Sequence, residues 1–329
     1  MSVIIGGSGS SGSTMLISKL STHPELFCGG EINFFNKEQL FEDWNKNKMK
    51  ILPLFPFFST KGWHIYRRNS LHRSEYGWTK EEIKKLLKTS HSINNFSEQY
   101  FNRPLLKKGA KFWIEKTPSN CYSFSLFLKT FPKSKVVHIA RNPLDTIASI
   151  YKKDQRVFHA VGNWLYNNAT ALNVSDSENY YLIKYEDLIY DTNNSFSKLC
   201  LFLGIDSKDI KLDLGIDNKL IPTWNNSPTA KISDSSMGKF NFLSQEVKDE
   251  IYTALAYFEV SDSHKNKKNI KYIDFNTICE KLNYSSVIHP KESMLKKIKL
   301  DLKKDKLNRT IKMYATGGDF YPIQLKDIL

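Results

Sequence analysis

The stretch that decides the fold is Val3-Ile4-Ile5-Gly6-Gly7-Ser8-Gly9-Ser10-Ser11-Gly12-Ser13-Thr14. Its β-branched start predicts a short buried strand, and residues 14–20 predict a helix that the His23-Pro24 pair closes. The glycine-rich turn between them can bring several backbone N–H groups and the positive helix end onto one phosphate. A flexible linker is the alternative, but linkers do not usually join a strand to a helix so near a chain start. We therefore expect a phosphate-binding loop, whose ligand-contacting residues are Gly9, Ser10, Ser11, Gly12, Ser13 and Thr14.

This loop differs in one position from the nucleotide-hydrolase pattern G-x-x-x-x-G-K-[ST]. Gly7 to Thr14 match the pattern, except that Ser13 stands where the lysine would be. The point charge that grips β- and γ-phosphates is therefore missing, which argues against ATP or GTP chemistry. A P-loop kinase of a small molecule, which would need ATP and Mg²⁺, stays as the alternative.

Strands and helices alternate through the first two-thirds of the chain. The apolar patterns predict strands over 111–115, 135–140 and 180–184, and helices over 143–153 and 196–203. Strands that alternate with helices form parallel sheets covered on both faces. The fold class is therefore α/β, a P-loop-type parallel sheet flanked by helices.

Two segments interrupt this alternation. Residues 41–110 are aromatic and basic, and we interpret them either as a substrate-facing cap or as a helical insertion with its own small core. The other segment, 265–312, is lysine-rich and helical in pattern. We expect an α/β domain over residues 1–260 and a basic, mostly helical C-terminal extension over 261–329.

Composition narrows the class of protein. With 329 residues and 40% apolar content, the chain can bury a substantial core. Its net charge of +14 favours phosphate, sulfate, nucleic acid or an anionic membrane surface as partner. Residues 265–312 hold 14 basic against 5 acidic residues, so this segment is either a solvated helical face or a docking surface for peripheral contact with an anionic partner.

Membrane and metal signals are weak. The sequence has no apolar run of about 18 residues, which excludes a transmembrane helix. It also shows no signal-peptide pattern. The four cysteines lie far apart, without Cys-x-x-Cys or a histidine at ligand spacing, so we expect reduced, buried thiols and no zinc site. This fits a cytoplasmic protein, and no carboxylate cluster with Mg²⁺ spacing stands out.

A second phosphate signature runs from Lys135 to Ser149. An apolar strand ends at Arg141, and Asn142 and Pro143 are a good N-cap and a good first helical residue. The planar guanidinium fork and the Ser149 hydroxyl can converge on one phosphate. Taken alone, Arg141 could equally be a surface ion-pair partner and Ser149 an ordinary helix residue. The presence of the first loop makes the prediction of a phosphate site more specific.

With these motifs the chain resembles the sulfotransferases that use 3′-phosphoadenosine 5′-phosphosulfate (PAPS). The resemblance is closest to the branch with tyrosylprotein sulfotransferases and many bacterial carbohydrate sulfotransferases. It spans roughly residues 3 to 245 in the family's order. Its other motifs are His23-Pro24-Glu25, Cys28-Gly29-Gly30-Glu31, Glu115-Lys116-Thr117-Pro118, Lys184-Tyr185-Glu186-Asp187-Leu188 and Phe202-Leu203-Gly204.

The resemblance implies how the donor is held. The first loop would bind the 5′-phosphosulfate, and Arg141 with Ser149, eight residues apart, would bind the 3′-phosphate. The further donor contacts that it implies are Lys153, Tyr185 and Lys239. Many relatives carry Arg or Lys where this chain has Ser10. Either Ser10 and the backbone suffice, or a lysine from elsewhere reaches the 5′-phosphate.

The resemblance also implies catalytic roles. Glu31 stands where the branch places its general base, Lys116 where an ammonium neutralises the oxygen between sulfur and phosphorus, and Ser227 matches a late serine. Each role has a purely structural alternative. Glu31 could be a capping or surface glutamate, Lys116 a solvated lysine, and Tyr185 a ring that is only packed in the core.

The predicted function is therefore transfer of the sulfuryl group from PAPS to an acceptor hydroxyl, with 3′,5′-ADP as product and no metal. We expect a carbohydrate, lipid-linked glycan or small metabolite as acceptor rather than protein tyrosine, and no nucleic-acid partner. A basic nucleic-acid or membrane-binding protein with a degenerate loop is the remaining alternative.

Overall fold

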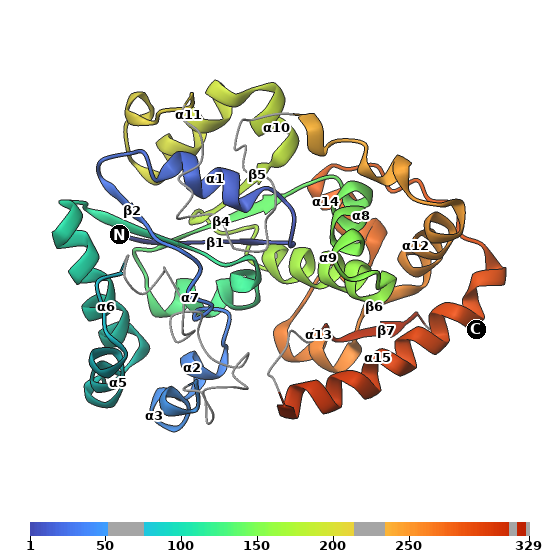
Figure 1. The fold of residues 1–329 in the computed structure, drawn as a ribbon, viewed down its shortest axis with the longest axis horizontal. Coiled ribbons are helices and arrows are strands. Elements are labelled where there is room, and N and C mark those ends of the chain that lie inside the picture. The colour runs from blue at the N-terminus through green and yellow to red at the C-terminus, as the bar shows by residue number, and fades with distance from the viewer. Residues whose placement is uncertain (52–75, 214–233, 316–320, 327–329) are drawn as a thin grey trace.

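A five-stranded parallel sheet forms the centre of the computed structural model, which describes residues 1–51, 76–213, 234–315 and 321–326 (Figure 1). The strand order is β2-β3-β1-β4-β5, with every neighbouring pair parallel. The strands are β1 (Ser2–Gly7), β2 (Leu26–Cys28), β3 (Phe112–Lys116), β4 (Lys135–Ala140) and β5 (Tyr180–Lys184). The predicted α/β class and parallel sheet are confirmed.

Helices cover both faces of this sheet, as predicted (Figure 1). One face carries α1 (Ser13–Leu20), α10 (Tyr185–Tyr190) and α11 (Thr192–Leu203), and the other carries α6 (Ile93–Lys108) and α7 (Phe124–Thr130). Alternate side chains of β1 serve the two cores: Val3 and Ile5 pack with α1 and α11, whereas Ile4 packs with α6 and α7. This alternation follows from the two-residue period of a strand.

The described part of the predicted insertion has its own aromatic core on the β3 side of the sheet. Its elements are α2 (Gln39–Glu42), α3 (Trp44–Asn47), the 3-10 helix η1 (Lys48–Ile51), α5 (Lys80–Thr89) and α6. Phe101 stacks on Trp113 of β3 at 3.9 Å between ring centroids, and Trp78 stacks on Tyr100 at 5.9 Å. This packing supports the helical-insertion interpretation for these residues, whereas residues 52–75 of the predicted insertion lie outside the described residues.

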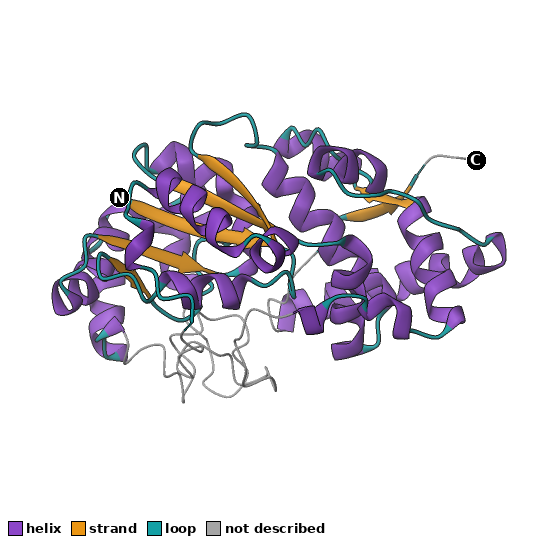
Figure 2. Cartoon of the chain, turned by 90° about the horizontal axis from the view of Figure 1, so that it is seen from above, coloured by secondary structure: helices purple, strands orange, loops and turns teal. Residues whose placement is uncertain are grey.

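A helical half lies beside the carboxyl ends of the strands (Figure 2). Its elements are α8 (Pro143–Asp154), α9 (Val157–Leu172), α12 (Gln245–Tyr257), β6 (Phe258–Val260), α13 (Asp262–Lys268), α14 (Phe275–Leu282), α15 (Leu295–Ala315) and β7 (Ile323–Leu325). The 3-10 helices beyond η1 are η3 (Pro118–Ser123), η4 (Ser207–Asp209), η6 (Asp234–Ser236), η7 (Lys239–Phe242) and η8 (Glu292–Met294).

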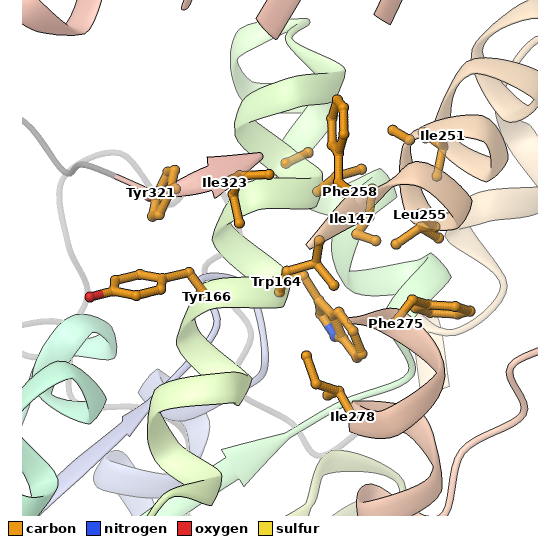
Figure 3. Close-up of a cluster of buried hydrophobic side chains, with 14 of the residues drawn as sticks. Ile147, Trp164, Tyr166, Ile251, Leu255, Phe258, Phe275, Ile278, Tyr321 and Ile323 are labelled. Carbon is orange, nitrogen blue, oxygen red and sulfur yellow. The ribbon is translucent and has the colours of Figure 1, made fainter. Parts of the chain in front are cut away.

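One apolar cluster joins the predicted C-terminal extension to α8 and α9. Trp164 of α9 is 1% exposed and packs beside Phe275 and Ile278 of α14, with Leu255 of α12 in the same cluster (Figure 3). Burying so many large side chains together makes this cluster a major source of stability for the helical half. The division into units at residue 260 stays a prediction.

Local sequence signals explain the well-predicted elements. The Asn142 side chain accepts a hydrogen bond from the Asp145 N–H at 3.1 Å, and Pro143 is the first residue of α8, so the predicted cap is confirmed. β2 has three residues, too few for a strand pattern, and was not predicted. Among the described helices, none combines the length and apolar character that a membrane span requires.

A buried histidine predicts acid sensitivity of the fold. His138 of β4 is fully buried between the Tyr180 hydroxyl at 2.7 Å and Asn168 Oδ1 at 3.0 Å, and burial lowers its pKa to about 4. The unfolded chain binds this proton from about pH 6.5 downwards, whereas the folded chain does not do so until about pH 4. The stabilisation is therefore complete above about pH 6.5 and lost as the pH falls towards 4.

We expect His138 alone to account for a loss of about 1 kcal/mol in the free energy of unfolding between about pH 7.5 and pH 5.5. Urea denaturation of the wild type and of His138→Gln at both pH values measures it. The substitution should flatten the pH dependence, leaving the contribution of His264, whose pKa burial also lowers to about 4. Equal pH slopes in the two proteins would contradict the assignment.

Candidate functional site

The loop between β1 and α1 is held in a conformation that needs glycine at its end. Gly12, the N-cap of α1, has φ 94°, and a Cβ there would lie 2.4 Å from Cδ2 of Tyr185. Ser10 also has a left-handed backbone, with φ 63°, and the Ser11 hydroxyl donates to the Ser8 carbonyl at 2.7 Å. The aromatic ring of Tyr185 thus packs directly on the loop. The structure therefore brings together the loop and Tyr185, both of which the sequence assigns to the donor site.

Arg141 ties the end of β4 to this loop. Its guanidinium is 3% exposed, and one nitrogen donates to the Ser10 carbonyl at 2.9 Å while another donates to the Ser236 carbonyl. The guanidinium also lies 4.9 Å from the centre of the Tyr185 ring. Burial lowers the pKa of Arg141, and the neighbouring Tyr185 and Asp145 act in the opposite direction. A planar donor fork is therefore fixed beside the loop.

One face of α8 extends this cationic region. Asp145, Ser149 and Lys153 follow Arg141 at intervals of four residues, so they share a face of the helix. The Lys153 Nζ donates to the Ser10 hydroxyl at 2.9 Å. Of the two alternatives left open for the uncharged loop, this contact favours a lysine that reaches in from elsewhere. Ser149 lies half-buried between them.

Lys239 joins the same region from a distant part of the chain. The Asp145 carboxylate accepts hydrogen bonds from the backbone N–H groups of Gly238 at 2.8 Å and Phe240 at 3.0 Å. This pair of bonds anchors the turn that carries Lys239. Its pKa is lowered by burial first and then by the nearby cations Arg141, Lys152 and Lys153. The structure therefore gathers several cations where an anion with more than one charge would be stabilised.

Glu31 and Lys116 form an ion pair on the other side of the loop. Their side chains are 11% and 3% exposed, and the Lys116 Nζ also lies 3.4 Å from the Thr14 hydroxyl at the start of α1. β2, β3 and β1 are neighbours in the sheet, so their carboxyl ends bring these three residues together. A carboxylate, an ammonium and a hydroxyl thus meet beside a phosphate-type loop.

Glu115 holds the backbone beside Glu31. It is fully buried, and one oxygen accepts from the Ile32 N–H at 3.0 Å and from the Thr117 hydroxyl at 2.7 Å, while the other accepts from Asn120 Nδ2 at 2.6 Å. Burial raises its pKa, and the negative charge of Glu31 adds to this rise. Glu115 stood in a quoted motif, but sequence reasoning gave it no role.

Tight packing also fixes the backbone segment that leads to Glu31. A Cβ on Gly29 would lie 2.4 Å from the Tyr76 ring, and the Tyr76 hydroxyl donates to the Gly30 carbonyl at 2.9 Å. Tyr76 therefore leaves room only for glycine at position 29 and holds the backbone that leads to Glu31.

Some residues at the site were not predicted, and one predicted residue lies outside the described residues. Asp145, Asn163 and Asn168 position the loop or its cations, and their signal in the sequence is a polar side chain in a helix that is otherwise buried. Ser227 lies outside the described residues. Within the described ranges, no group of three His, Cys, Asp or Glu side chains could hold a metal ion.

Comparison with known proteins gives a family match. The family model described as Sulfotransferase family matches residues 2–209. Sulfotransferase 2A6 of Rattus norvegicus is 26% identical over 160 residues, 43% of this chain and 52% of the relative. The 3-beta-hydroxysteroid sulfotransferase of Cavia porcellus is 26% identical over 185 residues, 46% and 62% of the two chains. The matched regions cover about half the length of these relatives.

Solved structures of low identity also align with the chain. The sulfotransferase domain from the curacin biosynthetic pathway has 18% identity and a TM-score of 0.43, covering 86% of this chain and 97% of that domain. Mouse sulfotransferase SULT7A1, complexed with PAP, has 14% identity and a TM-score of 0.40, covering 77% and 83%.

Proposed function

Because this chain belongs to the sulfotransferase family, we propose that it transfers the sulfuryl group of PAPS to a hydroxyl group of an acceptor and releases 3′,5′-ADP. The observation that carries this proposal is the contact between Glu31 and Lys116, with the Lys116 Nζ 3.4 Å from Thr14 of the loop. A candidate base and a candidate stabiliser of the leaving group thus lie beside the loop that would hold the phosphosulfate.

The donor set fits a nucleotide with phosphate groups at two ends. The loop offers backbone N–H groups and hydroxyls that can bind the 5′-phosphosulfate, although it holds no cation of its own. We assign the 3′-phosphate to Arg141, Ser149 and Lys239, of which Arg141 and Lys239 lie near each other. Tyr185 contacts both Gly12 of the loop and the Arg141 guanidinium. Lys153 bridges the two regions through Ser10 and supplies the charge that the loop lacks.

The chemistry follows from the two charged side chains. Glu31 takes the proton of the acceptor hydroxyl as the new oxygen–sulfur bond forms in line with the oxygen–sulfur bond that breaks. Lys116 neutralises the charge that develops on the departing phosphate oxygen. The two side chains form an ion pair, which holds the carboxylate and the ammonium beside the loop.

The acceptor is proposed from its hydroxyl chemistry. The Cavia porcellus relative is named for 3-beta-hydroxysteroids, which are alcohols, and a carboxylate base suits alcohols of several classes. We therefore retain a carbohydrate, a lipid-linked glycan or a small metabolite as the acceptor. The exposed lysines of α15, Lys296, Lys303 and Lys304, support peripheral contact with an anionic surface. Cytoplasmic location stays a prediction.

Donor binding is tested by affinity for immobilised 3′,5′-ADP. The wild type should be retained, and free PAPS should elute it, whereas ATP with Mg²⁺ should not, because the loop lacks the lysine that grips β- and γ-phosphates. Arg141→Ala should lose retention. Elution by ATP with Mg²⁺ but not by PAPS would favour the kinase alternative. Elution by salt alone, without preference among nucleotides, would favour the nucleic-acid or membrane alternative.

A charge relocation tests the role of Lys153. Lys153→Ala should weaken 3′,5′-ADP and PAPS binding by about fivefold, the scale of one partly exposed charge-assisted contact. Adding Ser10→Lys should restore most of the PAPS affinity, because the charge returns to the loop itself. The matched control is Lys129→Ala, an exposed lysine of α7. Calorimetry measures both ligands, and a double variant as weak as Lys153→Ala would contradict the proposed bridge.

Removal of the base should separate turnover from binding. Glu31→Gln should lower turnover by about two to four decades, the usual scale of general acid–base catalysis, and leave donor affinity almost unchanged. Glu42→Gln, on the exposed surface of α2, is the control. Sulfate transfer from labelled PAPS across a panel of glycan and phenolic acceptors measures turnover. Wild-type turnover in Glu31→Gln would remove Glu31 from the role of base.

A further inference from the structure

Helix α9 carries three asparagines although it is almost wholly buried. Asn167 and Asn168 are each 1% exposed, and Asn163 lies half-buried one turn before Asn167. A buried amide costs free energy unless its oxygen and its nitrogen both find partners. The partners of these asparagines therefore show what the helix is built to hold.

Two of the asparagines hold consecutive residues of the phosphate-type loop. Asn163 Oδ1 accepts a hydrogen bond from the Gly9 N–H at 3.1 Å, and Asn168 Nδ2 donates to the Ser8 hydroxyl at 3.0 Å. Asn167 supports the first contact, because its Nδ2 donates to the same Asn163 oxygen at 3.0 Å. The loop is thus fixed from beneath by side chains about 155 residues later in the chain.

The other end of the Asn163 amide reaches the C-terminal part of the protein. Asn163 Nδ2 donates to the hydroxyl of Tyr321 at 2.7 Å, and this hydroxyl lies 3.3 Å from His159 Nε2. Tyr321 is 2% exposed and precedes β7, which pairs with β6 (Figure 3). It lies against α9 at Gly162, where a Cβ would come within 3.3 Å of the Tyr321 Cβ.

These contacts have a fixed direction. The Gly9 N–H and the Asn167 Nδ2 can only donate, so the Asn163 oxygen faces them and its nitrogen faces the Tyr321 hydroxyl, which accepts there and holds the amide in place. An amide turned the other way would set two N–H groups against each other at Gly9. The chain of hydrogen bonds therefore transmits the position of the C-terminal segment to the loop.

We propose that Asn163 and Tyr321 are positioning residues for the donor site, so that the C-terminal segment at Tyr321 sets the geometry with which the loop receives the 5′-phosphosulfate. This inference rests on the proposed function. Neither side chain needs to touch the donor. Their contribution is to hold Gly9 in one conformation before binding. Donor binding then has a smaller entropic cost, because the glycine-rich loop is already ordered.

The test compares 3′,5′-ADP and PAPS affinities of Asn163→Ala, Tyr321→Phe and the double variant, by calorimetry on the full chain. Tyr321→Phe removes one hydroxyl and should weaken binding about fivefold, and Asn163→Ala about tenfold, the scale of one or two hydrogen bonds. The double variant should bind no more weakly than Asn163→Ala, because both changes break the same chain of contacts.

Tyr166→Phe is the matched control, since it removes a buried hydroxyl of the same helix that contacts His264 rather than the loop. It should lower the melting temperature about as much as Tyr321→Phe but leave both affinities unchanged. A merely structural role for Tyr321 would give equal affinities in these two variants, and this result would overturn the inference. Losses that multiply in the double variant would overturn the shared chain of contacts. Failure of the wild type to bind either ligand would instead refute the proposed function.

Discussion

The site depends on one constraint: a loop made of glycine and serine has only short side chains with which to hold itself, such as the Ser11 hydroxyl that donates to the Ser8 carbonyl. Its backbone would sample many conformations unless other elements restricted it. In this protein Arg141 donates a hydrogen bond to the Ser10 carbonyl, and Tyr185 packs on Gly12. Asn163 of α9 accepts a hydrogen bond from the Gly9 N–H. The contacts come from β4, from the start of α10 and from the helical half. The loop therefore has a defined shape only when the whole sheet and α9 are assembled around it.

Electrostatics at the site follow from the same assembly. Burial is the main cause of the lowered pKa of Lys239, and the neighbouring cations Arg141, Lys152 and Lys153 lower it further, so the cations near α8 repel one another. The negative charges of Asp145 and Glu186 offset this repulsion at Arg141, since both raise its pKa. Backbone N–H groups hold the two carboxylates in place: those of Gly238 and Phe240 for Asp145, and that of Asn142 for Glu186. A bound anion with several charges relieves this repulsion, so part of its affinity derives from the positive charges already gathered in the protein.

The positive charge of the chain has more than one use. Few cations lie at the site, whereas 265–312 holds a surplus of nine positive charges. Some of these lysines stabilise the fold: Lys297 pairs with Glu250 at 2.8 Å and with Glu246 at 3.0 Å across α12 and α15, and Lys268 pairs with Glu38. Net charge alone therefore did not locate the functional site. The positions of individual cations relative to the loop did.

Local pattern by itself determined the strand, loop and helix of residues 2–20, the capped start of α8, and the α/β class. These are consequences of periodicity, capping chemistry and glycine, all of which act over a few residues. The contact of Lys153 with Ser10, the anchoring of Lys239 by Asp145, and the path from Tyr321 through Asn163 to Gly9 were decided only by the tertiary structure. These contacts join residues about 90 to 160 positions apart in the chain. No periodicity or spacing in the sequence encodes which of the many lysines, asparagines and tyrosines will meet when the sheet packs against the helical half.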